Sequence, residues 1–140
     1  MNIPKDAVVG LTAMSAELLH AGHCMALAEA KAQCDYLIVA FNVSPEKRLC
    51  VESVFERWLR LKGSRYVDEI IPYESEADLQ LIHDMYLPHV HKRFVGEDYR
   101  GRNFTGKTAC EMFGVQVIYT PRSHSLSVTE LKRRIAKDNN

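Results

Sequence analysis

The sequence predicts an α/β fold built on a mostly parallel sheet, and two observations carry that prediction. Short apolar runs alternate along the chain with segments whose apolar residues recur at helical spacing. The clearest run, residues 36–41, is apolar throughout, as expected of a strand whose two faces are both covered by helices.

In the first half of the chain, the pattern predicts strand, helix, strand and helix at residues 7–11, 22–33, 36–41 and 51–62. Residues 12–19, after the first strand, are expected to form a loop. Met25 and Ala28 belong to a modest apolar face of the first helix. The second helix has a stronger apolar face, and Gly63 is expected to end it.

In the second half, the pattern predicts strands at residues 69–72, 93–96 and 115–119 and helices at residues 76–87, at residues 105–113 and from Ser127 onward. Pro72 stops the first of these strands, because proline cannot donate to a sheet ladder. Leu79 and Ile82 stand at helical spacing. Ser127, with Glu130 three residues later, is the pattern of a capping box.

Together these elements predict a doubly wound, Rossmann-like sheet of about five mostly parallel strands with helices on both faces. Ligands bind such sheets at the carboxyl ends of the strands. The turn at His20 and the turn before Ser127 both follow predicted strands. We therefore expect the two turns to converge on one site.

Composition narrows the class of protein. The chain has 140 residues, which predicts a single domain over 1–140, and its 46% apolar and 26% charged residues are ordinary for a globular protein. Eighteen basic residues balance eighteen acidic ones, so we expect no nucleic-acid partner. No stretch reaches the roughly 20 apolar residues of a membrane span, and the first residues lack the apolar core of a signal peptide. We expect a cytoplasmic protein without a membrane partner.

Residues 20–23, His-Ala-Gly-His, have the pattern of a phosphate-binding turn. A helix N-terminus attracts anions through its unpaired N–H groups and its dipole, and Gly22 has no Cβ to keep a phosphate away. His20 and His23 would project from nearly the same side of the first helical turn, where each can donate a hydrogen bond. From spacing alone, a surface turn that merely contains two histidines is an equally good interpretation.

Several stretches in register resemble a known family. Residues 20–23 match the HxGH signature of the nucleotidyltransferase superfamily named for its HIGH motif, and the chain most resembles glycerol-3-phosphate cytidylyltransferase-like proteins. Residues 30–39 are similar to the family's AK-x-x-x-DYL-[IV]-V segment, and residues 65–72 to its RYVDEVIP strand. Residues 95–99 resemble its GDDW or GDEY turn, and residues 122–129 occupy the place of its RTxGISTT motif.

The resemblance implies a reaction and a set of roles. A phosphorylated alcohol would attack the α-phosphate of CTP, or of another nucleoside triphosphate, and release pyrophosphate. By resemblance, His20 and His23 are the catalytic residues. The residues implied to bind the nucleotide are Ser15, Glu17, Gly22, Asp98, Arg122, Ser127, Val128 and Thr129. Those implied to bind the small phosphorylated acceptor are Lys47, Arg48 and Arg57. The triphosphate implies a Mg²⁺ ion, and the family implies a homodimer.

The chain departs from the family beside the histidines. Met14 stands at the position of a family glycine, Ala16 at that of an aromatic residue and Glu17 at that of an aspartate. Two alternatives therefore stay open: a non-catalytic member that acts as a binding or regulatory protein, and an adenylyltransferase that uses ATP.

Other polar clusters carry less weight. His83, His89 and His91 have no further ligand at a typical spacing, so we predict no metal-binding cluster. The basic residues 132–134 suit the end of a helix, where cations stabilise the dipole without any partner.

Overall fold

The fold is described by a computed structural model, which covers residues 2–45, 50–121 and 127–138. A five-stranded sheet has the order β3-β2-β1-β4-β5, and every neighbouring pair of strands is parallel. The strands are β1 (Val9–Met14), β2 (Tyr36–Asn42), β3 (Glu69–Tyr73), β4 (Lys92–Gly96) and β5 (Gln116–Thr120). The predicted α/β class is confirmed, and the sheet is parallel throughout its described strands.

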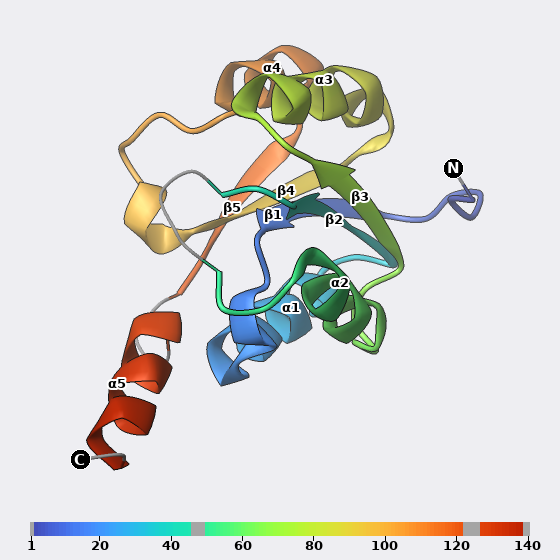
Figure 1. Ribbon diagram of the computed structural model, residues 1–140. Coiled ribbons are helices and arrows are strands. Elements are labelled where there is room, and N and C mark those ends of the chain that lie inside the picture. Colours follow the sequence, from blue (N-terminus) through green and yellow to red (C-terminus); the bar gives the residue numbers. More distant parts are fainter. Residues whose placement is uncertain (1, 46–49, 122–126, 139–140) are drawn as a thin grey trace.

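Helices cover both faces of the sheet, as predicted. They are α1 (Ala21–Ala32), α2 (Val54–Lys62), α3 (Glu76–Tyr86), α4 (Lys107–Phe113) and α5 (Val128–Asp138). Figure 1 shows α1 and α2 on one face, α3 and α4 on the other, and α5 beyond the body of the sheet. Short 3₁₀ turns precede α1 (η1, Glu17–Leu19), follow α3 (η2, Leu87–His89) and follow β4 (η3, Glu97–Tyr99).

The side chains of β2 point alternately to the two faces of the sheet, which explains why its sequence is one continuous apolar run. Its odd-numbered residues, Leu37 to Phe41, pack in the cluster that contains Leu27 of α1 and Leu61 of α2. Its even-numbered residues Ile38 and Ala40 pack instead with residues of α3 and α4. Both faces of this strand are therefore buried, which is the arrangement that the sequence predicted.

Two element boundaries differ from the prediction by three residues, and several others by one or two. Pro72 does not end its strand: β3 continues to Tyr73, because β3 is an edge strand, where proline is tolerated. β1 extends to Met14, beyond the predicted residues 7–11, because it pairs with β2 as far as the register Met14 to Phe41. The predicted loop at 12–19 therefore holds the end of that strand and the turn η1. α2 begins at Val54 because Ser53 caps it: the Ser53 hydroxyl accepts from the Glu56 N–H at 3.2 Å, and the Glu56 carboxylate accepts from the Ser53 N–H at 3.0 Å.

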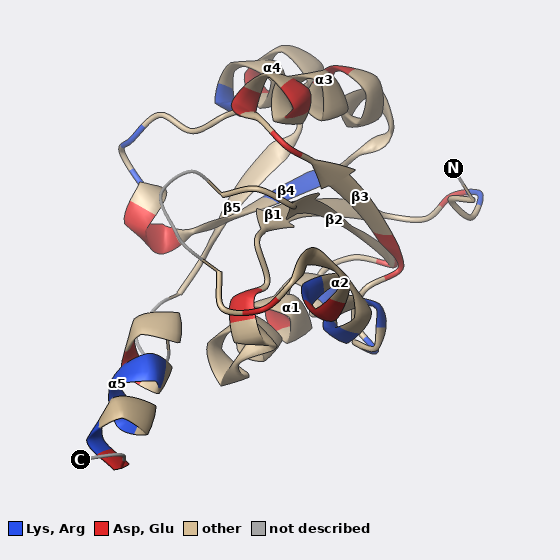
Figure 2. Ribbon diagram, in the orientation of Figure 1, with Lys and Arg blue, Asp and Glu red and all other residues tan. Residues whose placement is uncertain are grey.

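The strand order places β1 at the point where the winding of the sheet reverses. The chain moves outward from β1 through β2 to β3, and then returns to the other side of β1 with β4 and β5. Parallel sheets bind ligands at the carboxyl ends of the strands near such a point. Charged residues lie mainly on the helices and turns, although β4 carries a basic segment inside the sheet (Figure 2). Among the described residues, no helix has the length and apolar character to cross a membrane.

Candidate functional site

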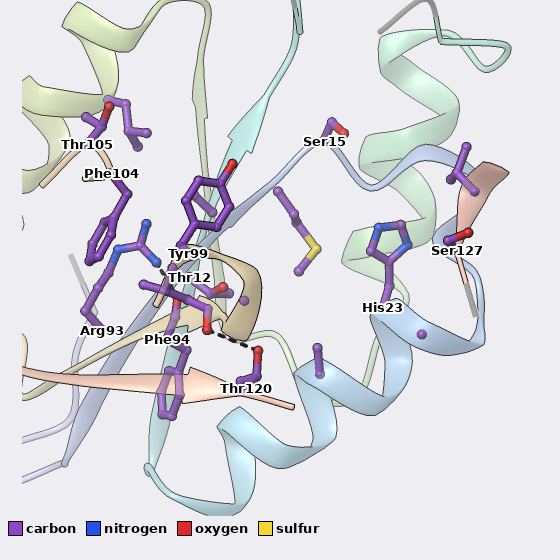
Figure 3. Close-up of a pocket in the computed structure, with 18 of the residues that line it drawn as sticks. Thr12, Ser15, His23, Arg93, Phe94, Tyr99, Phe104, Thr105, Thr120 and Ser127 are labelled. Carbon is purple, nitrogen blue, oxygen red and sulfur yellow. Dashed lines mark hydrogen bonds between the residues drawn. The ribbon is translucent and has the colours of Figure 1, made fainter. Parts of the chain in front are cut away.

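A cavity of about 500 Å³ opens at the carboxyl ends of the strands. Residues from the ends of β1, β3, β4 and β5 line it, together with the first turns of α1 and α5 and the segment before α4. Figure 3 shows His23 and Ser127 toward one side of this cavity and Arg93 with Phe104 toward the other. His20 and Ser127 thus line one cavity, as expected from the sequence, while residues 122–126 of the turn before Ser127 lie outside the described residues.

His20 and His23 cap the first turn of α1 for each other. The Nδ1 atom of His23 accepts from the His20 N–H at 3.2 Å, and the Nδ1 atom of His20 accepts from the His23 N–H at 3.3 Å. Their rings are stacked with centroids 3.9 Å apart. Because each neutral ring accepts through Nδ1, its hydrogen belongs on Nε2. The pair therefore has a fixed tautomer in which Nε2–H is the donor of each ring.

A second helix begins at the same cavity. Ser127 and Val128 line the cavity at the start of α5, and the Ser127 hydroxyl accepts from the Glu130 N–H at 3.0 Å. The carboxylate of Glu130 accepts from Arg133 at 2.8 Å, so its charge is matched within its own helix. Two helix N-termini that face one cavity favour an anion there, because both bring unpaired N–H groups and positive dipole ends.

The turn that carries His20 into place has a strained backbone. Ala16 and Leu18 have φ angles of 55° and 59°, in the left-handed region that residues with a Cβ rarely adopt. Each such residue costs about 1 kcal/mol or more. Ala16 is fully buried, so packing around it leaves no room for the turn to relax. Strong local interactions must hold this conformation.

Two buried carboxylates hold the turn reciprocally. Glu17 is fully buried, and its carboxylate accepts from the N–H groups of Val51 at 2.7 Å and Glu52 at 3.1 Å. The Glu52 carboxylate accepts in return from the Leu18 N–H at 2.5 Å. Lys132 of α5 lies 3.7 Å from Glu17, which ties the second helix to the same point. We call Glu17 and Glu52 the reciprocal carboxylates.

Burial alone would raise the pKa of Glu17. The N–H groups of Glu52 and Val51, the ammonium group of Lys132 and the thiol of Cys50 outweigh it, so the pKa of Glu17 lies below its usual value. Glu17 is therefore a carboxylate at neutral pH.

Arg57 holds the other side of the turn. It is 2% exposed, and its Nη1 atom donates to the Ser15 and Asn42 carbonyl oxygens, both at 2.8 Å. Nη2 donates to the Val43 carbonyl at 2.9 Å. The guanidinium therefore joins the end of β1 to the end of β2. Arg57 is therefore a buried part of the turn and not an exposed helix arginine.

The predicted site residues fall into three groups. Those that line the cavity are Ser15, His20, Gly22, His23, Ser127 and Val128. Those that the described lining does not include are Glu17, Arg57, Asp98 and Thr129. Asp98 and Thr129 are exposed beside lining residues, whereas Glu17 and Arg57 are buried behind the turn. Lys47, Arg48 and Arg122 lie outside the described residues.

Met14 is compatible with an open cavity. It lines the cavity as the last residue of β1, with the extended backbone of a paired strand. A methionine adopts this backbone without strain, so the absence of glycine at this position costs no conformational freedom here. The cavity keeps its volume with the Met14 side chain present.

The sequence reasoning missed Arg93 and Glu76. Both line the cavity, with the aromatic rings of Tyr73, Tyr99 and Phe104. A signal was available for Arg93, because a charged residue within a predicted central strand is either paired or functional. Glu76 opens α3, where an acidic residue is ordinary, so its place in the cavity had no distinct signal.

No group of three or more metal-ligating side chains occurs among the described residues. Within the described lining, Glu76 is the one carboxylate. The carboxylate of Glu76 accepts a hydrogen bond from the Thr105 hydroxyl. One carboxylate is enough for a Mg²⁺ ion that is held mainly by phosphate oxygens, since Mg²⁺ needs only one or two protein carboxylates.

Comparison with known proteins decides the family. The sequence profile described as cytidylyltransferase-like matches residues 15–134, which is most of the chain. The chain belongs to the cytidylyltransferase-like family. This is a family of nucleotidyltransferases, so the resemblance seen in the sequence motifs is confirmed.

Individual proteins are similar to the chain over most of its length. A glycerol-3-phosphate cytidylyltransferase of Bacillus subtilis is 35% identical over 125 residues, covering 86% of this chain and 91% of its own. That of Staphylococcus aureus is 29% identical and covers 85% and 88%. A lipopolysaccharide core biosynthesis protein of Thermoplasma volcanium, 16% identical, shares the fold with a TM-score of 0.69 over 84% of this chain and 99% of its own.

For this cytidylyltransferase-like chain, the buried carboxylate of Glu17 predicts a pH-dependent loss of stability in Glu17→Gln. The folded pKa lies below the unfolded value of about 4.3, so the carboxylate stabilises the fold above that pH and the contribution is lost as pH falls through the folded pKa. At pH 7 the variant should lose about 1–3 kcal/mol of unfolding free energy, measured by urea denaturation. The difference from the native protein should shrink below about pH 4.

Glu97→Gln is the matched control, because Glu97 is exposed and pairs with Arg100 at 3.4 Å. It should change stability by less than about 0.5 kcal/mol at either pH. A Glu17→Gln deficit that stayed constant down to the acid transition would contradict the role given to the carboxylate.

Proposed function

We propose that this protein is a cytidylyltransferase that couples CTP to a small phosphorylated polyol, such as glycerol 3-phosphate, and releases pyrophosphate. One observation carries the proposal: two helix N-termini and a mutually oriented histidine pair face a single cavity in a chain of this family. Glycerol-3-phosphate cytidylyltransferases that are 35% identical or less support the choice of CTP and of a phosphorylated polyol.

The proposed reaction is a single displacement at phosphorus. An oxygen of the acceptor phosphate attacks the α-phosphorus of CTP and forms a new P–O bond. The bond from that phosphorus to the oxygen bridging to the β-phosphate breaks, and its electron pair leaves with pyrophosphate. Such a transfer needs positioning and charge stabilisation more than covalent help from the protein.

In this proposal, His20 and His23 donate through Nε2–H to phosphate oxygens whose charge grows in the transition state. Their Nδ1 atoms are engaged by backbone N–H groups, which keeps the rings in the donating tautomer. Gly22, Ser127 and Val128 would bind the triphosphate through the N-termini of α1 and α5. Ser15 would contact the nucleotide from the end of β1.

The remaining predicted residues act less directly. Glu17 and Arg57 are proposed as positioning residues, because their charges are spent on backbone groups of the turn. Asp98 and Thr129 would act from the rim of the cavity. Lys47, Arg48 and Arg122 are proposed phosphate ligands by family resemblance. Mg²⁺ would accompany the triphosphate and neutralise part of its charge.

We also propose a homodimer, on family resemblance and on the exposed apolar face of α2. Phe55 and Leu59 are 64% and 51% exposed on that helix, next to Val54. A second copy of the chain would bury this face. Sedimentation equilibrium at micromolar concentration should give the dimer mass, and a monomer at every concentration would exclude this part of the proposal.

The test of the reaction is pyrophosphate release from CTP with Mg²⁺ and glycerol 3-phosphate, with ATP as the competing nucleotide. His20→Ala should lower kcat by about 10²–10³ through loss of a transition-state donor. His20→Asn is the matched variant, because asparagine is a good N-cap and preserves the helix start while it lacks the Nε2–H group. It should fold as the native protein does and be as inactive as His20→Ala.

A faster reaction with ATP than with CTP would replace CTP in the proposal by ATP. No turnover across a panel of nucleotides and phosphorylated acceptors would contradict the enzyme and favour a non-catalytic binding protein.

A further inference from the structure

Arg93 is a buried cation at the cavity, and the proposed reaction has so far given it no role. It lies in β4, is 5% exposed and lines the cavity. Among the described residues, no carboxylate forms an ion pair with it. Burial lowers the pKa of Arg93 from its usual value, although a guanidinium stays charged in proteins. A buried charge of this kind is costly unless an anion joins it.

Neutral groups orient the guanidinium without neutralising it. Its Nε–H donates to His83 Nε2 at 3.2 Å, and its Nη1 atom donates to the carbonyl oxygen of Phe94. The ring of Phe104 lies 5.7 Å from Cζ, in the geometry of a cation–π contact. These contacts engage only two of the five N–H groups of the side chain. Figure 3 shows the guanidinium between Phe104 and Tyr99, on the side of the cavity away from His23.

His83 is itself fixed as a neutral acceptor. It is fully buried, and its Nδ1 atom lies 2.7 Å from the Leu79 carbonyl oxygen, which can only accept. Nδ1 therefore carries the hydrogen and Nε2 accepts from Arg93. Burial also lowers the pKa of His83, which keeps the ring neutral beside the arginine. Gly106 makes room for the ring, because a Cβ there would lie 2.2 Å from His83 Cδ2.

The other arginine considered for substrate binding is engaged elsewhere. Arg57 donates to the carbonyl oxygens of Ser15, Asn42 and Val43, and it is absent from the described lining of the cavity. Arg93 is the one permanently charged cation in that described lining. Its place is away from the two helix N-termini, which suit the triphosphate.

We propose that Arg93 binds the phosphate of the acceptor substrate, a phosphomonoester dianion, in the half of the cavity lined by β4 and the segment before α4. This inference rests on the proposed function, which identifies the bound phosphomonoester as the acceptor. The binding itself is that of an arginine–phosphate pair. The bound dianion would supply the counter-charge that the buried guanidinium lacks. Arg93, and not Arg57, would then set the requirement for a phosphorylated acceptor.

The experiment compares acceptor and nucleotide binding in the full chain. Arg93→Gln and Arg93→Lys are measured beside Arg100→Gln, an exposed arginine outside the described lining that stacks on Tyr119. Loss of Arg93 should weaken glycerol 3-phosphate, as its KM and as its calorimetric Kd, by about 30-fold or more. The Kd of CTP with Mg²⁺ should change by less than about twofold, and Arg100→Gln should leave both near their native values.

A measurement on the native protein covers the case in which the variants fail to fold. The Nε–H resonance of Arg93 should shift when glycerol 3-phosphate or inorganic phosphate is added and stay in place with glycerol. A shift caused by CTP alone, or equal losses of CTP and acceptor affinity in Arg93→Gln, would overturn the proposal and assign Arg93 to the nucleotide. Unchanged acceptor binding in both variants would overturn it as well.

These outcomes separate the two proposals. Phosphate that binds at Arg93 in a protein without turnover would leave this site standing while the proposed reaction fails. Turnover that is indifferent to Arg93 would leave the reaction standing while this site fails.

Discussion

The structure depends on the bonding between the turn before α1 and the segment before α2. Glu17 accepts from backbone groups of residues 51 and 52, and Glu52 accepts from the backbone of Leu18. These are charge-assisted hydrogen bonds in a buried place, where each is stronger than a neutral one in water. They offset the left-handed backbone of Ala16 and Leu18, which the turn needs in order to leave β1 and start α1 at His20.

This constraint explains how distant parts of the chain share one site. The reciprocal carboxylates fix the start of α1, Lys132 draws α5 to Glu17, and Arg57 joins the ends of β1 and β2. The histidines and both helix N-termini consequently face the cavity at the strand ends. One side of the cavity holds the two helix N-termini and the histidines, and the other side holds Arg93. That division suits the proposed reaction between two phosphate-bearing substrates.

Local patterns predicted most of the fold because each of them reports a local cause. The buried run at residues 36–41 and the capping Ser127 both act within a few residues of themselves. The order of the predicted strands and helices is then compatible with only a few topologies. The end of β1 was missed because its length depends on pairing with β2, a partner about 27 residues away.

The site was predictable only where a motif carried it. His20, His23 and Ser127 belong to motifs, and the structure brings them to one cavity. The bond between Glu17 and the backbone of Glu52 joins residues 35 apart in the sequence. The bond from Arg57 to Ser15 joins residues 42 apart. A sequence reading places their charges on the substrates, since it has no means to show that backbone groups use them. The charge of Arg93 within a strand was a signal in the sequence, but its access to the cavity depends on the position of β4 in the sheet.

The affinity for CTP with Mg²⁺ in Glu17→Gln, Glu52→Gln and the double variant tests the central claim most directly, by calorimetry at pH 7 on protein shown to be folded. If the reciprocal carboxylates position the phosphate site, each single variant should bind CTP about tenfold more weakly than the native protein does. The double variant should bind CTP about as weakly as either single variant. Removal of a negative charge near a triphosphate would by itself strengthen binding. Unchanged or tighter binding in folded single variants would contradict the account.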